Sequence, residues 1–170
     1  MSLKNLNASN KIHKNLINNL KDKRIFQIYR KFEKILSINQ DFIVGVSGGS
    51  DSLALCFLTK IYSIKKSLNV YYFIVDHRLR KNSSTEAQSV KNLLKKHNIK
   101  SDILKWYGKK PNSNIQSLAR NKRFSLLTTQ AKKKNIKTIL TGHHIDDLYE
   151  NFFIRILRGS GLNGLVSFGK

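Results

Sequence analysis

The sequence contains almost none of the residues that form disulfides, thiolate zinc sites or rigid turns. Its 170 residues include one cysteine, Cys56, and one proline, Pro111. A single thiol excludes an internal disulfide and a zinc site built from several cysteines. Cys56 lies in the apolar run 53–58, so we interpret it as a small buried core residue.

Long apolar stretches are missing as well. No run approaches the roughly 20 residues needed to cross a bilayer, and the first residues lack the apolar middle of a signal peptide. We therefore expect a soluble, cytoplasmic protein with no membrane partner. The hydrophobic content of 40% is sufficient for one core of ordinary size.

Acidic residues are scarce. The chain has 10 Asp and Glu against 32 Lys and Arg, which gives a formal net charge of +22. Such a surplus attracts polyanions, and nucleic acid is the leading candidate partner. A general compositional bias towards Lys, Asn and Ile is an alternative source of the charge, so charge alone does not identify the substrate.

The hydrophobic pattern divides the chain near residue 40. Residues 1–40 predict a basic N-terminal arm and an amphipathic helix, and residues 41–170 predict a second unit with a different pattern. In the second part short β-rich runs alternate with longer amphipathic segments. This alternation predicts an α/β fold with a parallel sheet, helices on both faces and a ligand crevice beyond the carboxyl ends of the strands. The predicted strands cover 42–46, 70–75, 101–105 and 138–141, and the predicted helices 50–66, 85–97, 115–134 and 146–157.

The most specific motif lies between the first predicted strand and its helix. Glycines allow the backbone to approach an anion, and the helix N-terminus adds positive potential, so the loop suits a phosphate or pyrophosphate. The Gly-Lys-Ser/Thr ending of a Walker A loop is missing. A simple serine-capped turn is the alternative, but it requires neither two glycines nor an acid. The loop consists of Ser47, Gly48, Gly49, Ser50, Asp51 and Ser52.

These residues resemble the SGGxDS signature of the PP-loop ATP pyrophosphatases, which split ATP between the α and β phosphates. The resemblance implies an adenine nucleotide alpha-hydrolase-like, Rossmann-like fold that uses ATP and Mg²⁺. Residues 47–52 would then hold the departing pyrophosphate, and Asp51 would help to position the magnesium ion.

Further segments resemble the tRNA(Ile)-lysidine synthetases, and the similarity extends from about residue 41 to residue 165. Residues 75–80 resemble V-[ND]-H-G-L-R, with Arg78 in place of the glycine. Residues 114–124 resemble N-x-Q-x-x-A-R-x-x-R-[YF]. There Gln116, Arg120 and Arg123 share a helical face, so the two guanidinium groups could converge on phosphate; a solvated basic face is the alternative.

Two segments near the C-terminal end complete the resemblance. Residues 142–150 resemble G-H-x-x-D-D-x-x-E and bring the carboxylates of Asp146, Asp147 and Glu150 to one end of a helix, where simple helix capping is an alternative. Residues 155–165 resemble R-x-x-R-G-[ST]-G-x-x-G-L and favour the lysidine synthetase group. The adjacent histidines 143 and 144 lack partners for a zinc site.

The resemblance implies a ligase that forms a carbon–nitrogen bond. The wobble cytidine of tRNA(Ile) with a CAU anticodon would be adenylated at C2, and L-lysine would then replace AMP. We expect catalytic roles for four residues and substrate-binding roles for five more. The catalytic set is Asp51, Arg120, Asp146 and Glu150, and the substrate-binding set is His77, Arg80, Arg123, Asp147 and Arg158.

Three alternatives stay open at the level of sequence. One is a tRNA thiolase, although thiolases of this superfamily typically need paired cysteines, and another is a small-molecule amide synthetase. The third is a non-catalytic RNA-binding remnant, because the resemblance stops before the last strand and C-terminal domains of the family. The domain is therefore expected to be truncated, with a homodimer or a separate chain as a source of the missing parts.

Overall fold

The computed structural model describes residues 17–108 and 115–142. The predicted alternation of strands and helices is confirmed there, and the helix predicted over 146–157 lies outside the described residues. The helices are η1 (Asn19–Lys21, a 3-10 turn), α2 (Lys23–Ile35), α3 (Ser50–Lys66), α4 (Ser83–Lys96) and α5 (Ile115–Lys134). The strands are β1 (Phe42–Val46), β2 (Val70–Asp76), β3 (Ser101–Lys105) and β4 (Thr138–Thr141).

The four described strands form one parallel sheet in the order β3-β2-β1-β4. In the centre, Val44 of β1 stands opposite Tyr72 of β2 and Leu140 of β4. The chain adds β2 and β3 on one side of β1 and then returns to add β4 on the other. The carboxyl ends of β1 and β4 therefore meet at a reversal of strand order, where parallel sheets leave a crevice for ligands.

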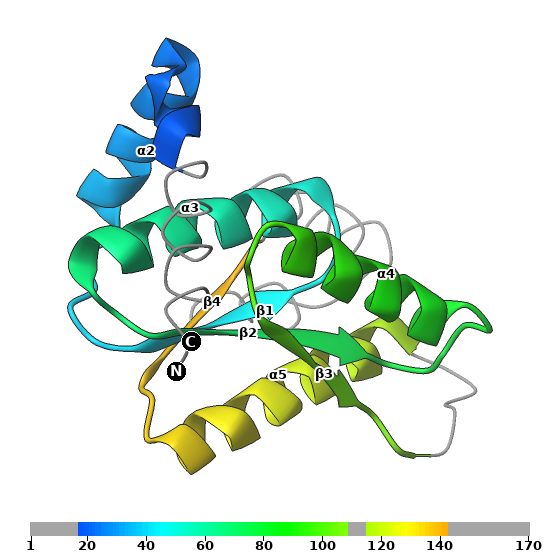
Figure 1. The fold of residues 1–170 in the computed structure, drawn as a ribbon. Coiled ribbons are helices and arrows are strands. Elements are labelled where there is room, and N and C mark those ends of the chain that lie inside the picture. Colours follow the sequence, from blue (N-terminus) through cyan, green and yellow to red (C-terminus); the bar gives the residue numbers. More distant parts are fainter. Residues whose placement is uncertain (1–16, 109–114, 143–170) are drawn as a thin grey trace, which may run out of the picture.

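Side chains of β1 alternate between two cores, because successive residues of a strand point to opposite faces. Phe42 and Val44 belong to the core beneath α3 and α4, whereas Ile43 packs with Phe73 and with Leu127 of α5. Figure 1 shows α3 and α4 on one side of the sheet and α5 on the other. The predicted arrangement, with helices on both faces, is confirmed.

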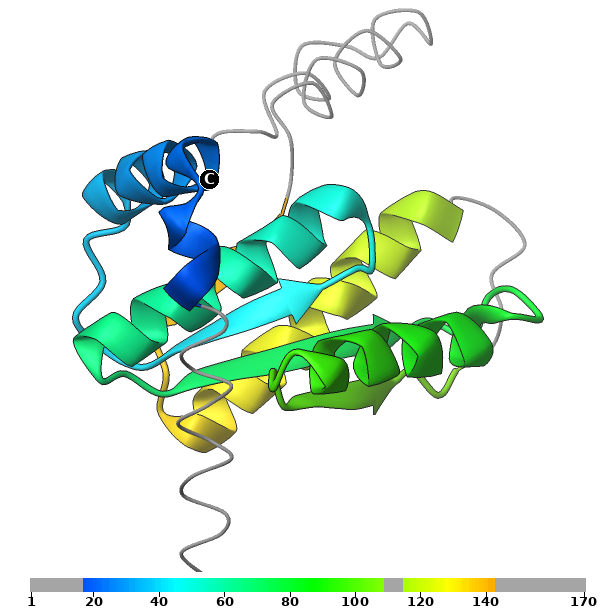
Figure 2. The same cartoon turned by 45° about the horizontal axis from the view of Figure 1, so that its top comes forward.

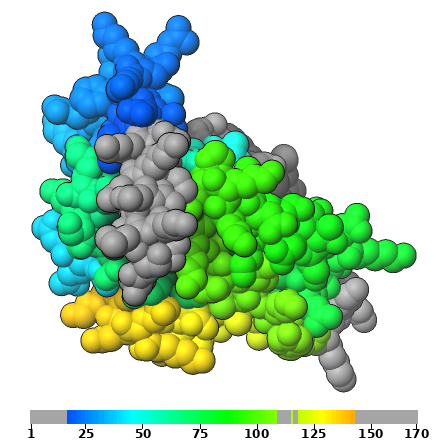
Figure 3. Space-filling model, viewed as in Figure 1, coloured from blue at the N-terminus to red at the C-terminus, as the bar shows by residue number. Residues whose placement is uncertain are grey.

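Helix α2 stands at one end of the molecule and projects beyond the sheet (Figures 1 and 3). Its first turn is capped by Asp22, whose carboxylate accepts hydrogen bonds from two backbone amides. Tyr29 is fully buried in the same core as α3. The Tyr62 hydroxyl donates to the carbonyls of Leu36 and Ile38, 2.7 and 2.8 Å away. A separate N-terminal unit ending at residue 40 stays a prediction.

The interpretation of Cys56 as a core residue is confirmed. Its side chain is fully buried on the sheet-facing side of α3. Burial raises the pKa of the thiol to about 12, which keeps it protonated at neutral pH. Within residues 17–108 and 115–142, no helix combines the length and the apolar character needed to span a membrane.

Candidate active site

The Ser47–Ser52 loop connects β1 to α3 and takes its shape from its two glycines. Gly48 has a φ of +89°, and a Cβ atom there would lie 2.7 Å from Cγ2 of Val90. Both the conformation and the close approach of α4 therefore require glycine. Gly49 is the N-cap of α3 and provides no side-chain cap, which leaves the helix N-terminus open to an external anion.

The buried side chain of Ser52 stabilises this loop through hydrogen bonds. Its side chain is 1% exposed, and its hydroxyl oxygen accepts hydrogen bonds from the backbone amides of Ser47 (2.9 Å) and Gly48 (3.2 Å). The loop is therefore folded back onto the first turn of α3. The geometry gives Ser52 a structural task in the loop in addition to the ATP contact expected from the sequence.

Asp51 lies at the outer side of the same turn. Its side chain is exposed, and the neighbouring Ser50 hydroxyl donates to its Oδ1 at 3.4 Å. The carboxylate stands beside the open helix N-terminus, where a polyphosphate would lie. Magnesium ions in proteins are commonly held by one or two carboxylates together with substrate phosphates, so Asp51 fits such an ion.

The end of β4 closes one side of the loop. A Cβ atom at Gly142 would lie 2.7 Å from both the Cα and the N of Ser52, and 3.0 Å from the carbonyl carbon of Asp51. The backbone after β4 thus packs directly on the backbone of the first turn of α3. Sequence reasoning included Gly142 in a motif but gave it no role; its signal was a glycine immediately after a strand.

The end of β2 is shaped by a buried acid, Asp76. Its carboxylate accepts a hydrogen bond from the Ser84 hydroxyl at 2.6 Å and one from the Arg78 amide at 2.9 Å. Burial raises the pKa of Asp76, but these hydrogen bonds, together with Ser83 and the positive charge of Arg78, outweigh burial and lower the pKa overall. Arg78 has a φ of +52°. A left-handed backbone at this position agrees with the glycine that the resembling motif carries there.

His77, the next residue, lies close enough to α5 to interact with Arg123, and it also lines a cavity after β2. Both of its ring nitrogens are buried without a hydrogen-bond partner in the described part of the chain. Burial lowers its pKa, and so does the positive charge of Arg123, while Asp76 acts in the opposite direction. Buried polar groups are normally hydrogen-bonded, and parallel sheets bind ligands at this edge, so His77 is suited to contact a ligand.

Arg120 and Arg123 lie close enough on α5 to interact. Arg123 is half-buried, and its pKa is lowered by burial first and by the charge of Arg120 second. Among the described residues no carboxylate forms an ion pair with either arginine. The first turns of α3 and α5 lie at the end of the sheet to which the strand arrows point (Figure 2). An anion at this edge would relieve the repulsion between the cations.

We expect His77 to make folding stability depend on pH. Its pKa is below 6.5 in the folded chain and near 6.5 when unfolded, so the unfolded state binds more protons between these values. Stability is therefore complete above about pH 6.5 and falls as the pH drops through the folded value. Urea unfolding at about pH 7.5 and about pH 5.5 should show a smaller loss for His77→Gln than for the unchanged chain. Equal losses in both proteins would contradict this.

The remaining predicted site residues are only partly placed. Arg80 is exposed in the loop between β2 and α4. Asp146, Asp147, Glu150 and Arg158 lie outside the described residues. In the ranges 17–108 and 115–142, no three His, Cys, Asp or Glu side chains are grouped closely enough to hold a metal ion.

The geometry of the Ser47–Ser52 loop agrees with the family to which the sequence is similar. A family model described as a PP-loop domain matches residues 18–170. The chain belongs to the PP-loop family. In this PP-loop protein the Ser47–Ser52 loop carries the family motif, and the sequence-based recognition of the family is confirmed.

Individual relatives of this PP-loop protein are tRNA(Ile)-lysidine synthases. It is 42% identical over 129 residues to the one from Orientia tsutsugamushi (strain Boryong), a match that covers 76% of this chain and 29% of the relative. It is 38% identical over 146 residues to the one from Rickettsia africae (strain ESF-5), covering 82% and 30%. The chain therefore spans less than a third of the length of these relatives.

Among solved structures, the U34-tRNA thiolase NcsA from Methanococcus maripaludis is similar to the PP-loop protein. The TM-score is 0.72, the match covers 87% of this chain and 55% of that chain, and the sequences are 16% identical. The predicted fold class is confirmed by this likeness. At so low an identity the likeness supports a shared fold and no more.

Proposed function

We propose that the chain is the ATP-binding catalytic part of a tRNA(Ile)-lysidine synthase, a ligase acting on cytoplasmic tRNA. The observation that carries the proposal is the Ser47–Ser52 loop, with its open helix N-terminus, its exposed acid and its closure by Gly142. The similarity to lysidine synthases over 76–82% of the chain selects this activity among PP-loop enzymes.

In the first step the C2 carbonyl oxygen of the wobble cytidine attacks the α-phosphate of ATP. A new oxygen–phosphorus bond forms, the bond to the β-phosphate bridge breaks, and pyrophosphate leaves. The amides of the loop and the N-terminus of α3 favour the departing negative charge. Arg120 and Arg123, which lack a carboxylate partner among the described residues, are suited to the charge that develops at the α-phosphate.

In the second step the ε-amine of lysine attacks C2, the bond from C2 to the adenylate oxygen breaks, and AMP leaves. Asp146, Asp147 and Glu150 are proposed to hold the lysine ammonium group before it loses its proton. His77, Arg80 and Arg158 are proposed to contact the tRNA. The three acids and Arg158 enter this scheme through the motifs alone.

Magnesium is proposed at Asp51, next to the pyrophosphate. When bound there, it would neutralise charge on the phosphates and favour departure of pyrophosphate. The residues fit such an ion, since Asp51 offers an exposed carboxylate and Ser50 an exposed hydroxyl beside it.

Thiolation is a weaker proposal for this chain. Cys56 is the only cysteine, and its thiol is fully buried with a pKa raised to about 12. A protonated, inaccessible thiol is unsuited to carry sulfur. The similarity to a thiolase rests on the fold, whereas the similarity to lysidine synthases rests on sequence.

The proposal is tested by incubating the purified chain with α-labelled ATP, magnesium, labelled lysine and unmodified tRNA(Ile) with a CAU anticodon. We expect AMP to form and lysine to become attached to the tRNA, and omission of tRNA should abolish both. AMP formation without lysine transfer would retain the PP-loop chemistry and reject lysidine synthesis. Absence of both products, with tRNA still bound, would favour an RNA-binding remnant.

A further inference from the structure

A cavity opens at the carboxyl edge of the sheet, after β2 and β3. It has a volume of about 470 Å³ and lies between the segment after β2 and the segment after β3. That volume is within the range of about 300–1,000 Å³ that is usual for small-ligand sites. We call it the Arg78–Tyr107 pocket. Its polar and aromatic lining comprises His77, Arg78, Arg80, Lys81, Ser83, Ser84, Trp106 and Tyr107.

The charge of the pocket is uniformly positive. Two arginines and one lysine line it, and none of its lining residues is acidic. The buried carboxylate of Asp76, at the end of β2, already accepts hydrogen bonds from the Ser84 hydroxyl and the Arg78 amide. The N-cap of α4, Asn82, makes no side-chain hydrogen bond to the helix, so the open N-terminus of α4 adds to the positive potential. An anionic ligand is indicated.

The other wall is aromatic. Tyr107 is 73% exposed, and the Arg78 guanidinium lies 5.3 Å from the centre of its ring. The indole of Trp106 packs against Gly108, where a Cβ atom would be only 2.8 Å from Nε1. Flat aromatic and guanidinium surfaces beside cations are how proteins hold unpaired nucleotides, with the base stacked and the phosphate paired.

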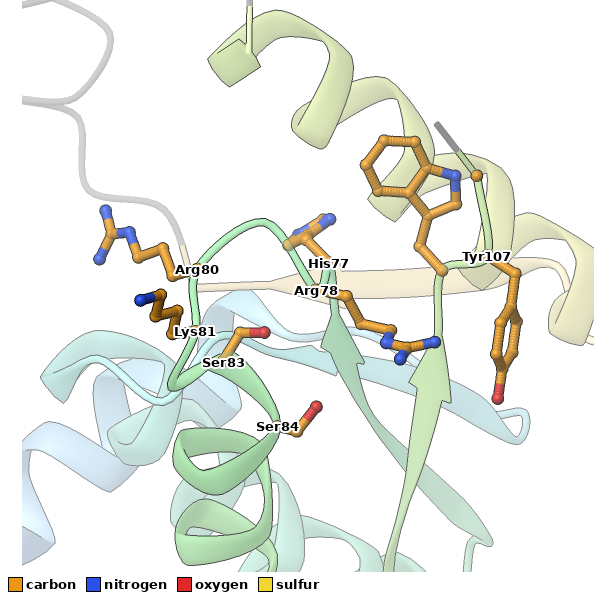
Figure 4. A pocket seen from close by; sticks show the side chains of 9 residues that line it. His77, Arg78, Arg80, Lys81, Ser83, Ser84 and Tyr107 are labelled. Carbon is orange, nitrogen blue, oxygen red and sulfur yellow. The ribbon is translucent and has the colours of Figure 1, made fainter. Parts of the chain in front are cut away.

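Hydrogen bonds within the protein fix the shape of the pocket without a ligand. The Trp106 amide donates to the Asp76 carbonyl at 2.9 Å and joins the end of β3 to the end of β2. The Asp76 carboxylate holds Arg78 in its left-handed conformation. Figure 4 shows the Arg78 side chain directed towards Tyr107, while Arg80 and Lys81 extend on the other side of the loop. Cations on two sides suit successive phosphates of a strand better than one isolated phosphate.

We infer that the Arg78–Tyr107 pocket binds an unpaired nucleotide of an RNA strand. The base stacks on the wall formed by Arg78, Trp106 and Tyr107, and the flanking phosphates pair with Arg80 and Lys81. The pocket follows β2 and β3, whereas the ATP loop follows β1, so the two ligands occupy neighbouring positions on one sheet edge. The inference deepens the proposed function, because it assigns the RNA substrate a contact apart from the reacting cytidine.

Trp106 is the only tryptophan of the chain, so its fluorescence reports on this pocket alone. We expect a short single-stranded RNA to quench it at low salt without ATP or lysine. Binding of the matching duplex, of cytidine monophosphate and of inorganic phosphate should each be weaker by about tenfold or more, because only the strand offers both a free base face and successive phosphates. Equal binding of phosphate or of the mononucleotide would overturn the assignment to RNA, and equal binding of the duplex would overturn the unpaired base.

Two variants test the residues. Arg78→Gly suits the φ of +52° and removes the guanidinium; it should weaken the single strand about tenfold and reduce the slope of log K against log salt by about 1. Tyr107→Ala alters an exposed side chain and should weaken binding by about tenfold through lost stacking. Arg30→Ala is the matched control, because Arg30 stacks on Phe26 of α2 at 5.9 Å, away from the pocket. Unchanged affinity in both test variants would overturn the inference.

The outcome is separable from that of the lysidine assay. Lysine transfer with no quenching of Trp106 would reject the pocket as an RNA contact and leave the proposed activity intact. Quenching that depends on Arg78 and Tyr107, without AMP formation, would support the pocket and reject the activity.

Discussion

Asp51→Asn is expected to lower the rate of AMP formation by about 100- to 1,000-fold, because interactions with developing phosphate charge contribute several kcal/mol to such reactions. The substitution keeps the shape of the side chain and removes its negative charge. Asp51 is exposed beside the open N-terminus of α3, and its carboxylate accepts a long hydrogen bond of 3.4 Å from the neighbouring Ser50, so it contributes little to folding stability. The rate should be measured with saturating ATP over a range of magnesium concentrations.

Glu86→Gln is the matched control for this experiment. Glu86 is the acid in the first turn of α4, as Asp51 is in the first turn of α3, and both side chains are exposed. Each substitution removes a favourable interaction with a helix N-terminus of about 0.3–1 kcal/mol. Only Asp51→Asn should cause the large reduction in the rate of AMP formation. Similar rates in the two variants would show that Asp51 acts through helix stability and not through phosphate or magnesium.

The second large effect is expected from Gly142→Ala. The added methyl group would stand 2.7 Å from the backbone N and Cα of Ser52, and backbone atoms yield less readily than the end of a side chain. Overpacking of this kind costs about 1–3 kcal/mol of folding stability. Because β4 must move away from α3 to make room, the Ser47–Ser52 loop should lose its shape and AMP formation should fall with it.

Gly49→Ala is the control for Gly142→Ala. It tests whether the loss at Gly142 comes from the close contact with Ser52 or from replacing a glycine in this region. A Cβ atom at Gly49 would meet nothing closer than the Ser47 hydroxyl at 3.8 Å, and the φ of Gly49 is −73°. We expect this variant to lose about 1 kcal/mol or less, the usual size of a change at an N-cap. Urea unfolding of the two variants measures the difference. A Gly142→Ala protein as stable as Gly49→Ala would contradict the tight packing between β4 and α3.

The elements and their order were predictable because they depend on local patterns. Apolar runs of strand length, separated by amphipathic helical segments, are sufficient to predict a parallel α/β sheet, and the described strands agree with the predicted ranges to within a residue. The anion-binding loop at 47–52 was also predictable, since a simple helix cap requires neither two glycines nor an acid. Even the left-handed backbone of Arg78 had a signal, in the glycine of the resembling motif.

The Arg78–Tyr107 pocket could not be predicted from the same patterns. Its two walls are 29 residues apart in the chain, counted from Arg78 to Tyr107, and meet only because β2 and β3 pair in parallel, with Asp76 opposite Lys105. Nothing in the local sequence of Trp106 and Tyr107 indicates which strand end they adjoin. The hydrogen bonds from the loop amides to the Ser52 hydroxyl could not be predicted for a similar reason. The sequence of a helix start does not indicate whether a serine hydroxyl contacts a ligand or its own loop.

By itself the sequence determined the order of the elements, the anion-binding loop and the family, because strand and helix periods and motif spacing are local properties of the chain. Tertiary structure alone decided which strand ends adjoin, and therefore that Gly142 closes on Ser52, that His77 lies near Arg123, and that cations and aromatic rings share one pocket. The physical reason is that parallel pairing and helix packing bring together side chains from distant segments, and their distances and charges exist only once the sheet has formed.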